Sequence, residues 1–210
     1  MQFGVDEAGK GPVVGSMFVA EVRAPRAALP DSIDDYKRLA AARREALAER
    51  LRSDDRVTIG IVEVTPSRID AGNMNDLAVT AHAEAIDAIA ERGDRGRCDA
   101  ADVDSERFGR RVEERVSADV TIEATHGADA TDALVGAASV IAKSEREHHV
   151  ETLEERFGEI GSGYPSDQVT RTFLRQYFLE HGQFPPPTRT SWSTCASIRA
   201  EAEQTDIEEF

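Results

Sequence analysis

Three residue types are scarce in this chain of 210 residues, which has two cysteines, one tryptophan and three lysines. Cys98 and Cys195 lie far apart in the sequence and match no metal-finger spacing, which argues against a disulfide scaffold and leaves two free thiols. No apolar run is long enough to cross a bilayer, and the first residues lack the basic and apolar regions of a signal peptide. We therefore expect a cytoplasmic protein with no membrane partner.

Positive charge is carried almost entirely by arginine, because only Lys10, Lys37 and Lys143 are lysines. Forty acidic residues against 25 basic ones give a net charge of -15. Such a surface holds water and opposes aggregation, and together with the shortage of lysine it is typical of a salt-rich cytoplasm. The alternative is a protein that avoids nucleic acid, since negative charge repels phosphate. In molar salt the Debye length is about 3 Å, so only charges at contact range decide between partners.

The chain is long enough to bury a real core, and its 40% hydrophobic and 31% charged residues are ordinary for one globular domain. Alternating or β-branched patterns predict strands, and apolar residues at helical spacing predict helices. The order of these segments predicts an α/β fold, a mixed sheet flanked by helices with a helical C-terminal part. The expected strands are 3–6, 13–22, 57–64, 97–100 and 120–124, and the expected helices are 38–51, 104–116, 131–157 and those beginning near 75, 166 and 190.

A turn rich in glycine follows the first predicted strand. Asp6 and Glu7 precede the segment Gly9, Lys10, Gly11. Glycine lets the backbone approach a ligand closely and present its amides, and a lysine supplies a compact charge for phosphate. The alternative interpretation is a tight turn beside a solvated acidic pair.

Two further carboxylates stand at the ends of other predicted strands, Asp99 after 97–98 and Asp129 after 120–124. Open α/β sheets bind ligands at this edge, so these groups could gather with Asp6 and Glu7 around one point. They would repel one another without a divalent cation, and oxygen-only ligands suit Mg²⁺ or Mn²⁺. Two such ions can activate water against a phosphodiester. Asp102 and Asp104 lie beside Asp99, and any of the three could instead cap a helix.

Five segments, in order over residues 1–198, together resemble the archaeal branch of ribonuclease HII. Each segment is a weak signal alone, but five in register are specific. The resemblance implies a ribonuclease-H-like catalytic domain over 1–188, a C-terminal helix over 189–203 and a tail over 204–210. The segments are Asp6 to Pro12, Asp99 to Asp104, His126 to Asp129, Ala137 to Lys143 and Gly158 to Asp167.

The resemblance also implies residue roles. The four carboxylates match the catalytic set that binds two divalent ions, and Gly9, Lys10 and Gly11 match a glycine-arginine-glycine turn whose backbone reads the ribose 2′-hydroxyl. Lysine here replaces the usual arginine, so a bidentate donor is lost. Tyr164 matches a tyrosine that packs on the sugar at the RNA-to-DNA junction. Lys37 stands in a divergent form of a motif in which Tyr36 replaces serine, and it still fits a phosphate contact.

The implied activity is hydrolysis of the RNA strand of RNA–DNA hybrids and cleavage 5′ of ribonucleotides embedded in duplex DNA, leaving 3′-hydroxyl and 5′-phosphate ends. We expect a monomeric, two-metal endonuclease. Two alternatives are another metal nuclease on a similar sheet, which would not require a 2′-hydroxyl, and a hybrid-binding module without turnover.

All three lysines fall inside these motifs, which suggests that a compact ammonium is wanted at Lys10, Lys37 and Lys143 in a chain that otherwise excludes it. Histidine gives a weaker signal. His126 lies near Asp129, whereas the other four are expected on helical or loop surfaces, and no histidine is expected to be a metal ligand. These four are His82, His148, His149 and His181.

The tail contains Gln204, Ile207 and Phe210, each three residues apart. This spacing resembles the short peptide by which replication and repair enzymes bind a sliding clamp, in which one helical turn places the apolar residues on one side. The usual second aromatic residue is missing. The alternative is a frayed acidic terminus.

Overall fold

The computed structural model describes residues 1–30 and 41–208, with side chains described up to residue 203. Its strands form one mixed sheet in the order β3-β2-β1-β4-β5. The central strand β1 (Gln2–Ala8) pairs antiparallel with β2 (Met17–Arg23), which pairs antiparallel with β3 (Thr58–Val64). On its other side β1 runs parallel to β4 (Arg95–Asp99), and β4 runs parallel to β5 (Thr121–Thr125). The expected mixed sheet is confirmed.

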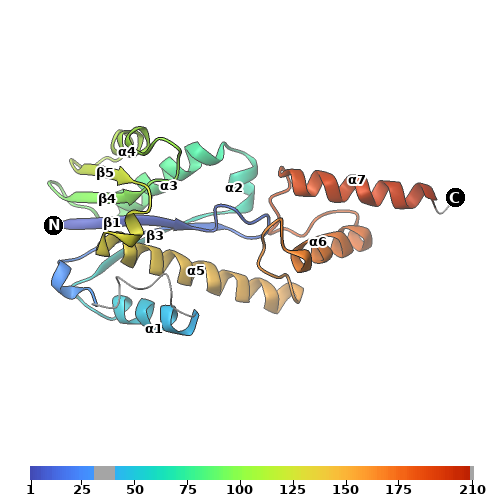
Figure 1. Cartoon of the computed structure of the whole chain (residues 1–210), viewed down its shortest axis with the longest axis horizontal. Coiled ribbons are helices and arrows are strands. Elements are labelled where there is room, and N and C mark those ends of the chain that lie inside the picture. Colours follow the sequence, from blue (N-terminus) through green and yellow to red (C-terminus); the bar gives the residue numbers. More distant parts are fainter. Residues whose placement is uncertain (31–40, 209–210) are drawn as a thin grey trace.

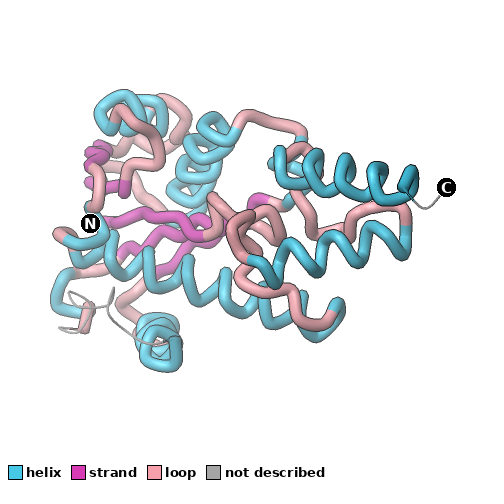
Figure 2. The backbone as a smooth tube through the Cα atoms, turned by 45° about the vertical axis from the view of Figure 1, so that its right-hand side comes forward, coloured by secondary structure: helices cyan, strands magenta, loops and turns pink. Residues whose placement is uncertain are grey.

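Helices cover both faces of the sheet, as Figures 1 and 2 show. On one face lie α3 (Met74–Ile89) and α4 (Ser105–Glu113), and on the other lie α1 (Ala41–Arg52) and α5 (Ala133–Phe157). A short helix, α2 (Pro66–Asp70), begins after the N-cap Thr65, whose side chain accepts from the Arg68 amide. Each face of the sheet therefore packs on its own apolar core.

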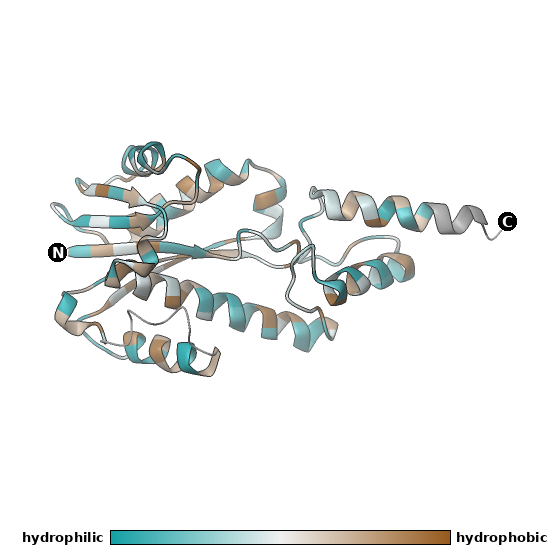
Figure 3. Ribbon diagram, viewed as in Figure 1, coloured by the Kyte–Doolittle hydropathy of each residue, from teal (hydrophilic) through white to brown (hydrophobic). Residues whose placement is uncertain are grey.

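The last two helices lie beyond the end of the sheet (Figure 1). Helices α6 (Gln168–His181) and α7 (Ser193–Glu208) share a third apolar core with Val13, Val14 and the end of α5. In α5 the first half is buried and the second half is largely charged (Figure 3). The helical C-terminal part is thus tied to the loop that follows β1. Over the described part of the chain, no helix combines the length and apolar character needed to span a bilayer.

Two strand predictions were wrong at the loop of residues 9–16, the glycine-rich loop. Strand β1 does not stop at Asp6 but continues to Ala8, because Ala8 still pairs with Phe18. The next strand begins at Met17 rather than at residue 13. The backbone of residues 13–15 bonds instead to Gly163 and Pro187, and Gly15 adopts a φ of 89° that interrupts a strand.

Helix boundaries also differ from the sequence predictions. Helix α4 ends at Glu113, not at 116. Helix α6 is capped by Asp167 rather than opened by Ser166, since the Asp167 side chain accepts from the Val169 amide. The last helix begins at Ser193 instead of near 190, because Thr190 and its neighbour donate backbone amides to Asp70. Residues 38–40 of the first expected helix lie outside the described residues.

Candidate metal and substrate site

Three carboxylates from separate segments converge at one edge of the sheet. Asp6 lies on β1, Asp99 is the last residue of β4, and Asp129 lies in the 3-10 turn Ala128–Ala130 that follows β5. One oxygen from each lies within 4.8 Å of the others. Asp6 and Asp129 are buried and Asp99 is half-buried. The parallel pairing of β1, β4 and β5 brings these groups to the same end.

The cluster resists ionisation without a cation. Burial and the charge of Asp99, against a hydrogen bond from Ser139 that lowers it, raise the pKa of Asp6 to about 7. Burial and the charge of Asp129 raise the pKa of Asp99 as well. A divalent ion would offset this repulsion, and an all-oxygen donor set suits a hard cation. The residues present therefore fit a divalent metal.

Glu7 lies outside this group of three. Its carboxylate Oε2 is 3.5 Å from Nε2 of His82, a fully buried side chain on α3. Burial and, to a smaller extent, the charge of Asp6 raise the pKa of Glu7 to about 8. His82 donates Nδ1–H to the Ala78 carbonyl, and burial lowers its pKa to about 4, so its ring is neutral. The expectation that His82 lies on a surface was wrong, because it belongs to the apolar face of α3.

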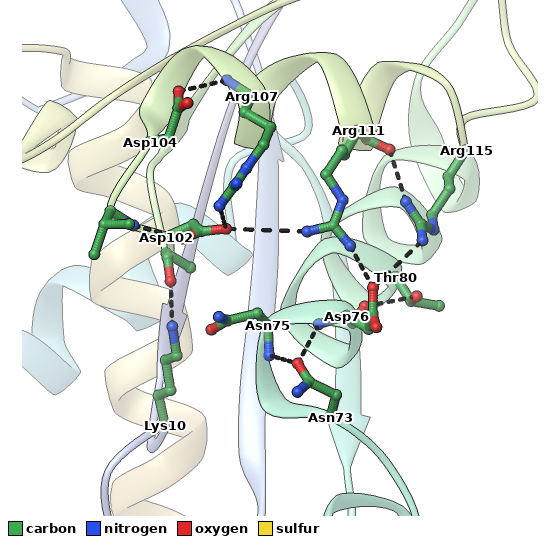
Figure 4. Close-up of polar contacts among 12 residues, drawn as sticks. Lys10, Asn73, Asn75, Asp76, Thr80, Asp102, Asp104, Arg107, Arg111 and Arg115 are labelled. Carbon is green, nitrogen blue, oxygen red and sulfur yellow. Dashed lines mark hydrogen bonds and ion pairs between the residues drawn. The ribbon is translucent and has the colours of Figure 1, made fainter.

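Figure 4 shows Asp102 and Asp104, the two aspartates of the loop after β4, with Arg107 and Arg111 of α4. Asp104 is the N-cap of α4 and accepts from the Arg107 amide at 2.9 Å. Asp102 pairs with Arg107 at 3.0 Å and with Arg111 at 3.9 Å. Asp99 is therefore not needed as a cap, and its Oδ1 accepts from the Ala128 amide beside Asp129.

A cavity of about 590 Å³ lies between the glycine-rich loop, α5 and the turn before α6. The ring of Tyr164 packs against Gly11 and is 47% exposed. The ammonium of Lys143 donates to Ser139 at 2.8 Å, whereas that of Lys10 donates to the Ala101 carbonyl. Most of the expected substrate residues therefore meet here, while Lys37 lies outside the described residues. The lining includes Gly9, Lys10, Gly11, Lys143, Arg146 and Tyr164.

Three polar residues at this site were not singled out from the sequence. Ser139 touches Asp6, and its spacing of four from Lys143 on one helix was a usable signal. Arg146 and Arg189 are buried beneath the glycine-rich loop. No local pattern distinguishes these two from the other arginines of the chain.

Known proteins resemble this chain over nearly its whole length. A family model described as Ribonuclease HII matches residues 3–195. The ribonuclease HII of the halophilic archaeon Natronomonas pharaonis is 62% identical over 99% of this chain and 98% of that protein. The crystal structure of ribonuclease H2 from Pyrococcus horikoshii OT3 is 34% identical, with a TM-score of 0.90 over 96% of this chain and 98% of that one. A chain in the structure of the PCNA:RNase HII complex from Archaeoglobus fulgidus is 36% identical, with a TM-score of 0.84 over 95% of this chain and 97% of that one. The chain therefore belongs to the ribonuclease HII family of RNase H endonucleases.

Proposed function

We propose that the chain hydrolyses the RNA strand of RNA–DNA hybrids and cuts duplex DNA 5′ of embedded ribonucleotides with two divalent ions, Mg²⁺ or Mn²⁺. The observation that carries this proposal is the convergence of Asp6, Asp99 and Asp129 within 4.8 Å. Glu7 is proposed as the fourth carboxylate of the set, from the position next to Asp6. Bound divalent ions supply an activated water and stabilise the leaving oxygen of a phosphodiester.

Several residues that line the cavity beside the carboxylates would bind and orient the substrate. The backbone of Gly9, Lys10 and Gly11 is proposed to contact the ribose 2′-hydroxyl, and the exposed ring of Tyr164 to pack on the sugar next to it. Lys143 also lines the cavity and is proposed to contact a phosphate, and Lys37 is proposed to have a similar role. In this arrangement the amides and the tyrosine choose the site, while the carboxylates hold the metal.

A cleavage assay tests the proposal directly. Three labelled duplexes are compared in high salt with Mg²⁺ or Mn²⁺: one with a single embedded ribonucleotide, an RNA–DNA hybrid, and an all-DNA control. We expect a cut on the 5′ side of the ribonucleotide, cleavage of the hybrid and no cut in the all-DNA duplex. Cleavage of the all-DNA duplex would instead favour a nuclease that does not read the 2′-hydroxyl, and binding without turnover would favour a non-catalytic module.

A second proposal concerns a protein partner. The complex from Archaeoglobus fulgidus holds a related ribonuclease HII with PCNA. In this chain Gln204, Ile207 and Phe210 have the spacing of a clamp-binding peptide. The backbone of 204–208 belongs to α7, and these three side chains lie outside the described residues. We propose that the tail binds a sliding clamp.

Calorimetry of the peptide 200–210 with the sliding clamp of the same organism checks this proposal. We expect a micromolar Kd, roughly -8 kcal/mol. Phe210→Ala should abolish binding because it removes the terminal apolar group, whereas Glu209→Ala should retain it. Full-length Phe210→Ala should still cut short duplexes. Absence of binding by the native peptide at high micromolar concentration would contradict the proposal.

A further inference from the structure

Two buried guanidinium groups lie beneath the glycine-rich loop of residues 9–16. Arg189 is 0% exposed and Arg146 is 8% exposed. Neither forms a salt bridge with any residue that the structure describes. Burial lowers the pKa of both, that of Arg189 to about 10. Burying two cations with no carboxylate in contact among the described residues is costly. The Trp192 ring, with its centroid 5.1 Å from Cζ of Arg189, offsets part of this cost for one of them.

Arg189 joins the two ends of this loop. Its Nη1 donates to the Lys10 carbonyl at 2.8 Å, and its Nη2 donates to the carbonyls of Gly9 and Gly15, the latter at 2.9 Å. Its Nε donates to the Gly15 carbonyl at 3.0 Å. Only a guanidinium offers enough donors in one plane to bind three carbonyls in this way.

Arg146 fills the space that glycines leave. Gly9, Gly15 and Gly163 have φ values of 85°, 89° and 79°, and a Cβ on any of the three would come within 3.5 Å of the Arg146 side chain. A Cβ on Gly9 would stand 3.0 Å from Cδ of Arg146, and one on Gly163 would stand 2.9 Å from its Nη2. That Nη2 also donates to the Val14 carbonyl at 3.1 Å. Two segments far apart in sequence thus fold around one side chain.

The amides of the loop divide into two sets. Those of residues 13–16 are used internally: residues 13 and 14 donate to the Gly163 carbonyl, Gly15 to the Pro187 carbonyl and Ser16 to Nε2 of His149. Those of residues 9–11 donate to no acceptor in the described part of the chain, and these residues line the cavity. With the carbonyls of residues 9, 10 and 15 bound by Arg189, the amides of residues 9–11 remain for a ligand. Successive backbone amides of this kind bind anions and oxygen acceptors.

We propose that Arg146 and Arg189 are positioning residues that hold the loop carbonyls inward and thereby keep the amides of residues 10 and 11, which share peptide planes with the bound carbonyls of residues 9 and 10, directed to the substrate at the ribose. This inference rests on the proposed function, because it assigns the loop to ribose recognition. The guanidiniums touch the backbone of the loop and not the carboxylate cluster. Being buried, their hydrogen bonds are screened little by molar salt, unlike surface charges.

The test uses Arg189→Lys and Arg146→Lys, with Arg171→Lys as the matched control. Arg171 lies on α6 and pairs with Glu201 at 3.4 Å, away from the cavity. We expect KM for the single-ribonucleotide duplex to rise at least about tenfold in Arg189→Lys, because one ammonium cannot bind three carbonyls. The effect on kcat and on divalent-metal affinity should be smaller. Hydrogen exchange of peptides covering residues 9–16 should accelerate in the substrate-free protein, while the control keeps wild-type values.

The outcomes separate this inference from the proposed function. Failure of the wild type to cut at a ribonucleotide would remove the proposed function, whereas exchange in the loop would still report whether the arginines hold it. Folded lysine variants with wild-type KM and wild-type exchange would overturn the positioning role. Equal losses of metal affinity, kcat and overall stability would also overturn it, since they would indicate a general structural role. If Arg189→Lys does not fold, Arg146→Lys decides, because Arg146 donates to a single carbonyl.

Discussion

Asp99→Asn and Asp129→Asn are each expected to lower turnover by about 10³-fold or more, and Asp99→Asn should also make the metal-free protein slightly more stable. Each change removes one charge from the cluster within 4.8 Å at nearly constant size. Metal ions contribute several kcal/mol to phosphodiester cleavage, and each 1.36 kcal/mol is a factor of ten in rate. In Asp99→Asn the same change reduces the repulsion among buried carboxylates and therefore stabilises the metal-free folded state. A stability change of about 1 kcal/mol would shift Tm by roughly 2–4 °C.

Single-turnover cleavage and thermal unfolding with and without metal would measure both effects on the same preparations. Asp119→Asn is a suitable control because the Asp119 side chain is 78% exposed and, among the described residues, forms an ion pair with the exposed Arg92 alone. It should change neither quantity. Near-normal cleavage by Asp99→Asn or Asp129→Asn would remove that residue from the metal site. A fall in the metal-free stability of Asp99→Asn would mean that this carboxylate is a structural acceptor rather than a member of a repelling set.

The convergence of Asp6, Asp99 and Asp129 was predictable because each follows a recognisable strand, and parallel strands bring their ends to one edge. The separation of Glu7 from these three was not predictable, because the predicted strand stopped at Asp6. In the structure β1 continues to Ala8, so the side chains of Asp6 and Glu7 alternate between the two faces of the sheet. The aspartate that caps α4 was also ambiguous, because three aspartates lie within six residues. Only the geometry of the Asp104 side chain decides it.

Buried polar residues were the part that local patterns could not predict. Arg189 meets its loop carbonyls across about 175 positions in the sequence, and Arg146 meets Val14 across 132. His82 lies on a helix whose apolar spacing is clear, but the sequence alone does not decide whether a histidine at this position is buried or exposed. Glu21 lies within a strand that is apolar apart from Glu21 and its last residue, Arg23, and its charge favours exposure, but the structure buries it completely. Such positions depend on long-range partners that periodicity does not report.

Glu21 gives the second large expected effect. It is 0% exposed on β2, and neither carboxylate oxygen has a hydrogen-bond partner among the described residues. Burial, together with the charges of Asp94 and Asp87 and against the opposing charge of Arg23, raises its pKa from 4.5 to about 9. Arg23 is itself paired with Asp94 and Glu91, both at 2.6 Å. Glu21 is therefore protonated in the folded protein at neutral pH.

The sign of the pH effect follows from this difference. The folded state binds a proton at Glu21 more tightly than the unfolded state. The contribution of Glu21 to the free energy of unfolding is therefore complete below about pH 4.5 and is lost as pH rises towards 9. By pH 7 the loss amounts to about 3 kcal/mol. Glu21→Gln keeps the size and cannot ionise in either state. We expect it to be more stable than the wild type by about that amount at pH 7, with little difference near pH 4.5.

Urea unfolding at constant high salt between pH 4.5 and 9 would measure the difference. Glu106→Gln serves as the control because the Glu106 side chain is 87% exposed, and it should leave the pH dependence of the wild type unchanged. A Glu21→Gln variant whose advantage is the same at every pH would show that the amide improves packing or hydrogen bonding instead. A variant less stable than the wild type at pH 7 would mean that the Glu21 carboxylate is ionised and stabilised in the folded core. We expect neither outcome, because a buried Glu21 carboxylate without a hydrogen-bond partner costs more free energy when it is charged than when it is protonated.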